Sequence, residues 1–330
     1  MSQSLPIKRH TSLLTRFPEI KDASFLDKQK SNWIVFSSYL TPKLFEAMDF
    51  YLGQVTPVID CWKVGNYEVV LMLGDITSGH QEFLSSMNID YAELIDIPEL
   101  TNPGVAVFDM DSTLIDMECI DEIAKLAGVG HEVSKVTESA MQGELDFEES
   151  LRLRVSKLEG APEAILEQVK QTLPLMPDCI ELITTLKSFG WKTAIASGGF
   201  TYFSEHLKEL CGFDYAQSNQ LEIVDGRLTG KVIGEVVSAS TKADVLQSLA
   251  AKYEIEMNNT IAVGDGANDL VMMRSAGLGV AYHAKPKVEQ EAQAAVKFVG
   301  LGGVLCILSA GLVKYKRLSW LDSVPAVSAE

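Results

Sequence analysis

The chain has 330 residues, and since one domain typically takes roughly 100–200 residues, we expect two or three domains. Hydrophobic residues make up 47% of the sequence and charged residues 22%, which is typical of a globular protein and argues against a disordered one. The net charge of −17 argues against a nucleic-acid partner, because nucleic-acid-binding proteins usually present a basic face. A small soluble ligand is therefore expected.

The sequence has none of the patterns of a secreted, membrane-spanning or disulfide-bonded protein. The first thirty residues carry mixed charges and lack the apolar stretch of a secretory signal. The longest apolar segment, Val299–Val313, is shorter than the roughly 20 residues that cross a bilayer, so we interpret it as packed core. The five cysteines show no CxxC spacing, which predicts buried free thiols. We expect a cytoplasmic protein without a membrane partner.

Residues 1–30 are expected to be irregular, and residues 31–98 show a strand–helix–strand–strand–helix–strand pattern with a hairpin turn at Gly65-Asn66. This order resembles the ferredoxin-like topology of small, ACT-like ligand-binding domains, so we interpret 31–98 as a candidate regulatory domain. Its ligand stays open. The expected elements are the strands Trp33–Phe36, Val58–Val64, Tyr67–Leu73 and 91–97, and the helices Pro42–Leu52 and 77–87.

The rest of the chain has the pattern of an α/β core that a helical block interrupts. The apolar run Val105–Phe108 predicts a strand, and only helices follow until Pro177. From there strands alternate with helices, which indicates a mainly parallel sheet covered by helices. We expect a core formed by residues 104–116 and 177–330, a helical cap formed by 117–176, and a surface tail at 311–330.

Two of the predicted strands end in carboxylates. Asp109 and Asp111 follow the first core strand, and Asp265 and Asp269 follow the strand at Thr260–Val263. In an open α/β sheet, ligands bind beyond the carboxyl ends of the strands, so both clusters are expected at one site. Crowded carboxylates need a compensating cation, and oxygen ligands suit a hard ion such as Mg²⁺. The sequence therefore predicts a metal-dependent site.

Four motifs in order resemble those of the haloacid dehalogenase superfamily, from about Val105 to the C-terminus. They are Asp109–Thr113 (DMDST), a strand-end Ser197, Lys242 at the start of a helix, and Gly264–Asp269 (GDGAND). The resemblance implies a Rossmann-like core with a cap inserted after the first core strand. It also implies phosphoryl transfer through an aspartyl-phosphate.

The resemblance assigns a role to each motif residue. Asp109 would be the nucleophile and Asp111 the general acid and base, because splitting hydrolysis into two displacements needs one ionised and one protonated carboxyl group. One Mg²⁺ would be held by Asp109, the backbone carbonyl of Asp111 and Asp265, with Asp269 supporting it. The phosphate would be bound by Ser197, by the backbone N–H of Gly198 at the start of the next helix, by Lys242 and by Asn268.

In the cap, opposite charges over one phosphate site suit a zwitterionic substrate. Glu118 could pair with an α-ammonium group and Arg154 with an α-carboxylate. The run from Asp109 to Glu118, then Met141–Phe147 and Arg154, is similar to bacterial phosphoserine phosphatases, whose substrate-contacting glutamate, phenylalanine and arginine fall on Glu118, Phe147 and Arg154. The implied reaction is hydrolysis of O-phosphoserine to serine and phosphate, the last step of serine biosynthesis.

Three alternatives stay open at this point. The substrate could be another small phosphorylated metabolite, such as phosphohomoserine. The protein could instead be chiefly an amino-acid sensor with a vestigial phosphatase body, although all expected catalytic groups are present. The module at 31–98 could serve only self-association, for example in a homodimer.

Overall fold

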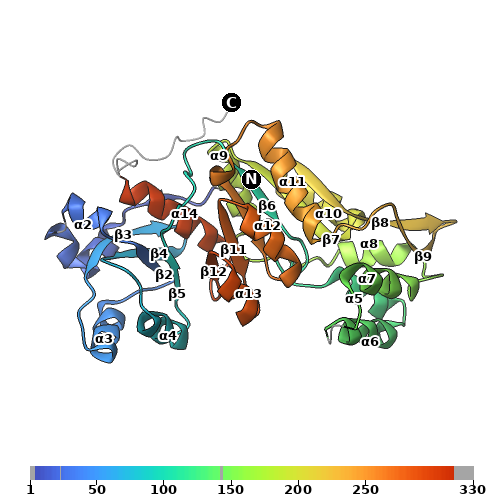
Figure 1. Ribbon diagram of the computed structural model, residues 1–330, viewed down its shortest axis with the longest axis horizontal. Helices are drawn as coiled ribbons and strands as arrows, with labels where there is room; N and C mark the ends of the chain where they lie inside the picture. Colours follow the sequence, from blue (N-terminus) through green and yellow to red (C-terminus); the bar gives the residue numbers. More distant parts are fainter. Residues whose placement is uncertain (1–3, 23, 142–143, 316–330) are drawn as a thin grey trace.

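The structure is a computed structural model that describes residues 4–22, 24–141 and 144–315. Figure 1 shows three parts side by side: an N-terminal sheet with its helices, a central sheet, and a group of helices at the far end. The fold is the predicted α/β core with a mainly parallel sheet, preceded by an α+β region. No helix in these ranges is long and apolar enough to cross a membrane.

The N-terminal sheet is antiparallel, and its strand order is β1-β3-β4-β2-β5. Side chains alternate across it, so Trp33 and Val35 face one side and Ile34 and Phe36 face the other. The strand–helix order predicted for this region is confirmed, with a last strand shorter than expected. The elements are β2 (Trp33–Ser37), α3 (Pro42–Leu52), β3 (Val58–Val64), β4 (Tyr67–Met72), α4 (Ser78–Ser86) and β5 (Asp90–Glu93).

The N-terminal segment differs from the irregular stretch expected. It contains β1 (Ile7–Lys8), α1 (Thr11–Arg16), a 3₁₀ turn at Pro18–Asp22 and α2 (Phe25–Gln29). Ion pairs join this segment to the sheet, because Arg9 and Lys28 both contact the buried carboxylate of Asp60. These short elements depend on tertiary contacts, which explains why no periodic sequence pattern predicted them.

The central sheet has seven strands in the order β12-β11-β10-β6-β7-β8-β9. All neighbours are parallel except β8 and β9, which form an antiparallel hairpin that the sequence analysis missed. The missed hairpin is polar and only partly buried, so it lacks a clear alternation of apolar residues. The strands are β6 (Val105–Phe108), β7 (Lys192–Phe200), β8 (Tyr215–Val224), β9 (Arg227–Ile233), β10 (Thr260–Gly264), β11 (Leu278–Tyr282) and β12 (Ala294–Val296).

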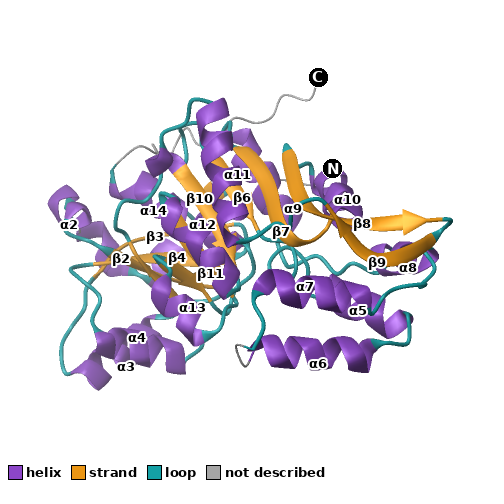
Figure 2. Ribbon diagram, turned by 45° about the vertical axis from the view of Figure 1, so that its right-hand side comes forward, coloured by secondary structure: helices purple, strands orange, loops and turns teal. Residues whose placement is uncertain are grey.

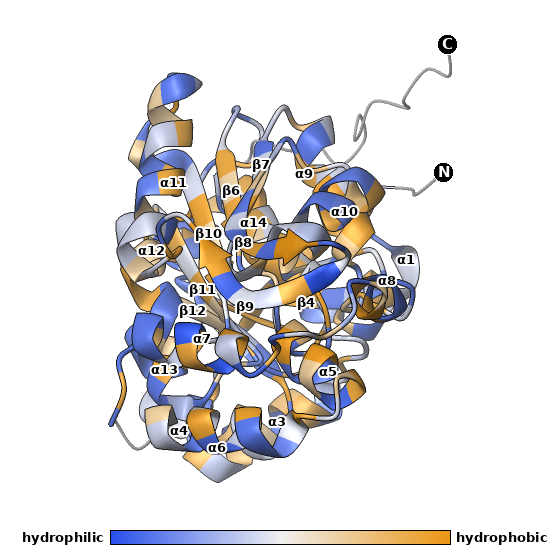
Figure 3. Cartoon of the chain, turned by 90° about the vertical axis from the view of Figure 1, so that its right-hand side faces the viewer, coloured by the Kyte–Doolittle hydropathy of each residue, from blue (hydrophilic) through white to orange (hydrophobic). Residues whose placement is uncertain are grey.

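Helices cover both faces of this sheet, and apolar residues concentrate on the central strands β6 and β10 (Figure 3). The five cysteines are buried and free, as predicted. The helices of the core are α9 (Cys179–Ser188), α10 (Thr201–Cys211), α11 (Ala239–Lys252), α12 (Leu270–Ser275), α13 (Pro286–Glu291) and α14 (Gly302–Lys314), with 3₁₀ turns at Met257–Asn259 and Ala267–Asp269.

Four helices form a block beside the central sheet, below the carboxyl end of β7 in Figure 2. Two connecting segments join the block to the core, and they pair with each other at Ile115 and Leu175. Backbone bonds from Asp116 N–H to the Pro174 carbonyl (2.9 Å) and from Met176 N–H to the Leu114 carbonyl (2.9 Å) flank this bridge. The helices are α5 (Cys119–Leu126), α6 (Gly130–Met141), α7 (Phe147–Ser156) and α8 (Ala164–Lys170).

Helix α14 packs between the N-terminal sheet and α9 of the core (Figure 1). This helix confirms that 299–313 is packed core. The expected surface tail is wrong over its first residues, since Leu312 and Val313 are buried and Lys314 donates to Asn32 Oδ1 at 2.9 Å. Residues 316–330 of that tail lie outside the described residues.

Candidate active site

The two carboxylate clusters meet at one end of the central sheet. Strands β6 and β10 are parallel neighbours, with Phe108 paired to Val263, and the Asp109 N–H donates to the Val263 carbonyl at 2.9 Å. Consequently Asp109, Asp265 and Asp269 each place an oxygen within 4.8 Å of the others. Register between adjacent strands, not sequence distance, determines this meeting.

Lys242 lies beneath the carboxylates in the first turn of α11 and is fully buried. Its Nζ is 2.7 Å from Asp109 Oδ2 and 2.7 Å from Asp269 Oδ1. Burial by itself would lower the pKa of Lys242, but Asp109 and Asp269 outweigh it and hold the pKa above its ordinary value. The ammonium group is therefore charged, contacts two of the three carboxylates and offsets one of their negative charges.

Asp265 is the carboxylate that Lys242 does not contact. Burial, followed by repulsion from Asp109 and Asp269, raises the pKa of Asp265 to about 7. A Cβ atom on Gly264 would lie 2.4 Å from Asp269 Cγ, so only glycine allows the turn to approach this closely. The set of carboxylate oxygens and the remaining uncompensated charge fit a hard divalent cation.

Asp111 lines the same cavity as Asp109. Burial raises the pKa of Asp111 well above its ordinary value, and the nearby Glu118 raises it further, while hydrogen bonding from Cys119 opposes both. Its Oδ1 is buried without a partner among the described residues. A carboxyl group in this setting is held protonated and can donate to an incoming oxygen.

The segment at Ser197 and Gly198 differs from the expected strand-to-helix step. Strand β7 continues to Phe200, so Gly198 lies within the strand and α10 begins only at Thr201. The Ser197 hydroxyl accepts from the Gly199 N–H at 3.0 Å. The buried Asn219 of β8 donates to the Gly198 carbonyl at 2.7 Å and fixes this segment.

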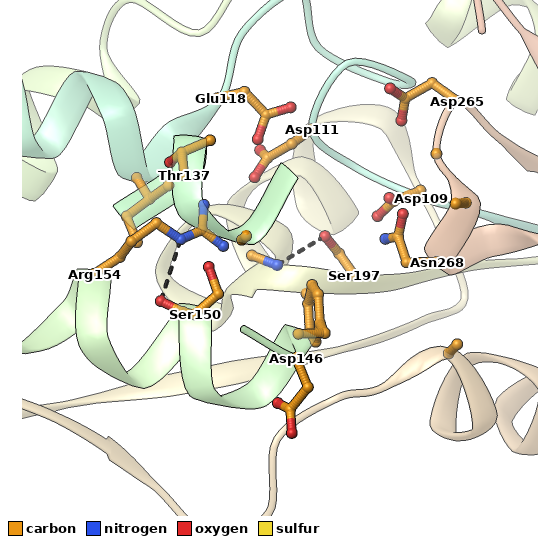
Figure 4. A pocket seen from close by; sticks show the side chains of 18 of the residues that line it. Asp109, Asp111, Glu118, Thr137, Asp146, Ser150, Arg154, Ser197, Asp265 and Asn268 are labelled. Atoms are coloured by element: carbon orange, nitrogen blue, oxygen red, sulfur yellow. Dashed lines mark hydrogen bonds between the residues drawn. The ribbon is translucent and has the colours of Figure 1, made fainter. Parts of the chain in front are cut away.

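A cavity of about 510 Å³ opens between this end of the sheet and the four-helix block, and Figure 4 shows side chains from both sides facing it. All predicted site residues line the cavity except Lys242 and Asp269, which lie buried behind Asp109. From the helical side come Glu118, at the N-terminus of α5, and Phe147 and Arg154 of α7. The structure therefore brings the two predicted halves of the site together.

The three side chains from the helical block differ in their contacts. Glu118 accepts from the Ser112 hydroxyl at 2.9 Å, and desolvation and the charge of Asp109 raise the pKa of Glu118. Burial lowers the pKa of Arg154, whose Nε donates to the Ser150 carbonyl at 3.4 Å. Phe147 lies against Gly198, where an added Cβ would come 2.6 Å from the ring.

Several lining residues were not assigned a role by the sequence analysis. Thr137, Leu145, Asp146 and Ser150 all border the cavity. For Ser150 alone the sequence held a signal, its helical spacing, since it lies three residues after Phe147 and four before Arg154. The side chain of Met141, the first residue of the Met141–Phe147 run, lies outside the described residues.

Comparisons with known proteins agree with this geometry. A family model described as haloacid dehalogenase-like hydrolase matches residues 104–277, and a model for a domain of unknown function matches residues 29–93. The phosphoserine phosphatase of Vibrio cholerae serotype O1 is 65% identical over 317 residues, covering 96% of this chain and 97% of the relative.

Solved structures give the same result. The crystal structure of a probable phosphoserine phosphatase from Vibrio cholerae, in unliganded form, superposes with a TM-score of 0.90 at 65% identity, covering 96% of this chain and 98% of that one. A phospho-aspartyl intermediate analogue of phosphoserine phosphatase superposes with a TM-score of 0.59 at 42% identity, covering 62% and 98%. This chain therefore belongs to the phosphoserine phosphatases within the haloacid dehalogenase-like hydrolases.

Proposed function

We propose that this protein hydrolyses O-phosphoserine to serine and phosphate through a phosphoryl group carried by Asp109, the last step of serine biosynthesis. One observation carries the proposal: a single cavity has carboxylates backed by a buried lysine at its base, and Glu118 and Arg154 at its other end. The names of the relatives support the substrate, and the intermediate analogue solved for a relative supports the aspartyl-phosphate.

We propose one Mg²⁺ as cofactor, held by Asp109, the backbone carbonyl of Asp111 and Asp265, with Asp269 supporting. The fit rests on the crowding of the three side-chain carboxylates and on their oxygen donors. When bound, the ion supplies positive charge that lets the anionic phosphate approach an anionic nucleophile.

The two aspartates of the first motif divide the chemistry between them. Asp109 attacks the phosphorus, and the bond from phosphorus to the serine oxygen breaks while Asp111 donates its proton to that oxygen. Asp111 then accepts a proton from the water that attacks the phosphorus of the aspartyl-phosphate. The bond between phosphorus and the Asp109 oxygen breaks, which regenerates the Asp109 carboxylate and releases inorganic phosphate. The raised pKa of Asp111 supports its protonated starting state.

The phosphate is bound at the base of the cavity. The Ser197 hydroxyl, the Gly198 N–H and the Asn268 amide donate to its oxygens, and Lys242 offsets the charge that develops during transfer. Lys242 is already held 2.7 Å from Asp109, so it needs little rearrangement to act.

The amino-acid part of the substrate lies toward the helices. Glu118 pairs with the α-ammonium group and Arg154 with the α-carboxylate, while Phe147 shields the reacting phosphoryl group from stray water. The helical cap at 117–176 thus sets specificity, and the core at 104–116 and 177–330 supplies the chemistry. We assign 31–98 to a ferredoxin-like domain with a regulatory role; the strand order β3-β4-β2-β5 supports the topology.

The test is a phosphate-release panel with O-phosphoserine, O-phosphothreonine, phosphohomoserine and p-nitrophenyl phosphate, each with Mg²⁺ and with a chelator. We expect O-phosphoserine to have the highest kcat/KM and the chelator to abolish turnover. Faster hydrolysis of phosphohomoserine would reject the substrate, and full activity in the chelator would reject the cofactor.

A further inference from the structure

Helix α7 turns one face toward the cavity, and a buried serine lies in the middle of that face. Residues three and four apart on a helix share a side, so Phe147, Ser150 and Arg154 line the same wall. Ser150 is 3% exposed, although it borders the cavity. Neither the motifs nor the proposed mechanism uses it.

The hydroxyl of Ser150 behaves differently from its neighbours. A serine or threonine inside a helix often donates to a carbonyl one turn earlier. Ser156, on the same helix, donates to the Leu153 carbonyl at 2.7 Å, and Thr137 of α6 donates to the Val133 carbonyl at 3.2 Å. Within the described ranges, the Ser150 hydroxyl has no hydrogen-bond partner. It therefore has a donor free for a ligand.

The backbone of Ser150 also positions the cationic group beside it. The Ser150 carbonyl accepts from Arg154 Nε at 3.4 Å, which leaves the terminal nitrogens of the guanidinium available. Arg154 forms no ion pair with any residue that the structure describes. Figure 4 shows Ser150 and Arg154 next to each other on the cavity wall. Two donors with no acceptor between them favour an anionic ligand group.

We propose that Ser150 is a specificity-determining residue whose hydroxyl donates a hydrogen bond to the α-carboxylate of the substrate, beside the guanidinium of Arg154. This inference deepens the proposed function and rests on it. Phosphate esters without a carboxylate gain nothing from Ser150, because the phosphate lies at the other end of the cavity. Discrimination then comes from a buried donor that only a carboxylate satisfies.

The test compares Ser150→Ala on three substrates: O-phosphoserine, O-phosphoethanolamine, which keeps the ammonium group but lacks the carboxylate, and p-nitrophenyl phosphate, which lacks both. We expect kcat/KM for O-phosphoserine to fall about tenfold, mainly through KM, as for loss of a hydrogen bond to a charged group. The other two substrates should change by less than about twofold. Ser150→Thr keeps the hydroxyl and should retain more of the O-phosphoserine activity than Ser150→Ala.

Ser156→Ala is the matched control, since it removes a hydroxyl from the same helix outside the cavity, and it should leave all three substrates unchanged. Equal losses on all three substrates, or no loss on any, would overturn the proposal. A shared loss on O-phosphoserine and O-phosphoethanolamine would also overturn it, because Ser150 would then serve the ammonium group. A wild-type protein without preference for O-phosphoserine would overturn both the proposed function and the role of Ser150. This outcome is measured on the wild-type protein alone, so it is distinguishable from a failure of the Ser150 proposal.

Discussion

At the bottom of the cavity a buried lysine forms ion pairs with two of the carboxylates, whereas at the cap end the opposite charges of Glu118 and Arg154 form no ion pair with each other. Lys242 lies 2.7 Å from both Asp109 and Asp269, and all three side chains are buried. Glu118 and Arg154 line the same cavity from different helices without an ion pair between them. The bottom of the cavity is therefore preorganised for one reaction. At the cap end, Glu118 and Arg154 are available to pair with the charged groups of a substrate.

The largest effect at the bottom of the cavity is expected from removing the proposed nucleophile, Asp109. Asp109→Asn nearly preserves volume but cannot form the aspartyl-phosphate, so we expect kcat to fall by at least about 10⁴-fold. Phosphate release from O-phosphoserine measures this loss. Substantial turnover in a sample free of wild-type protein would contradict covalent catalysis at Asp109.

Removing the positive charge of Lys242 at the bottom of the cavity should affect both activity and stability. Lys242→Met leaves Asp109 and Asp269 buried without their partner, so we expect a loss of about 3–5 kcal/mol in the free energy of unfolding of the metal-free protein. Turnover should fall roughly 10²–10³-fold. Chemical denaturation and kinetics measure the two effects, with the exposed Lys125→Met as control. Unchanged unfolding would mean that the ion pairs contribute little.

At the cap end, the geometry of the charge matters as well as its sign. Arg154→Lys keeps the charge but loses the planar fork, so KM for O-phosphoserine should rise roughly tenfold or more. Hydrolysis of p-nitrophenyl phosphate, which has no carboxylate, should change little. Equal losses on both substrates would place Arg154 with the phosphate or with the scaffold, and the difference between the two ends would disappear.

The smallest expected effect is a pH dependence of the metal's contribution to stability. The folded protein raises the pKa of Asp265 from 3.8 to about 7, so without metal the folded state keeps a proton that the unfolded chain releases. Stability of the metal-free protein should therefore fall as pH rises from about 4 to 7. Mg²⁺ binds the ionised carboxylates, so its stabilisation should grow over the same range.

Thermal melting with Mg²⁺ and with a chelator, at pH 5 and pH 7.5, tests this dependence. We expect the difference in Tm between the two conditions to be larger at pH 7.5. Asp265→Asn serves as the control, since it should reduce the pH dependence. An equal difference at both pH values would contradict the assignment of Asp265 to the metal.

The N-terminal region packs against the core, and these contacts determine which variants can test its role. The fully buried Trp62 donates to Ser309 of α14 at 2.8 Å, and Asp90 accepts three backbone N–H bonds from residues 297–299. Tyr67 donates to Asp178, beside the segment that joins the cap to the core. Deleting residues 1–98 would uncover α14, so point variants are the better probe of regulation.

The sequence by itself determined the parts that depend on local patterns. Runs such as Val105–Phe108 reveal strands because every residue is apolar and the run is short, and the motif residues stand next to them. Parallel neighbours then bring Asp109 and Asp265 together, which made the carboxylate cluster and the core predictable. The four helices α5 to α8 were predictable from four successive helical patterns.

Only the tertiary structure decided features that depend on distant partners. The elements before residue 31 are held by Asp60, the β8–β9 hairpin is too polar to show alternation, and the last turn of α14 is buried between two regions. Likewise, nothing in the sequence indicates that Lys242 contacts two carboxylates or that the Ser150 hydroxyl lacks a partner. Such contacts join residues far apart in the chain, and local periodicity carries no information about them.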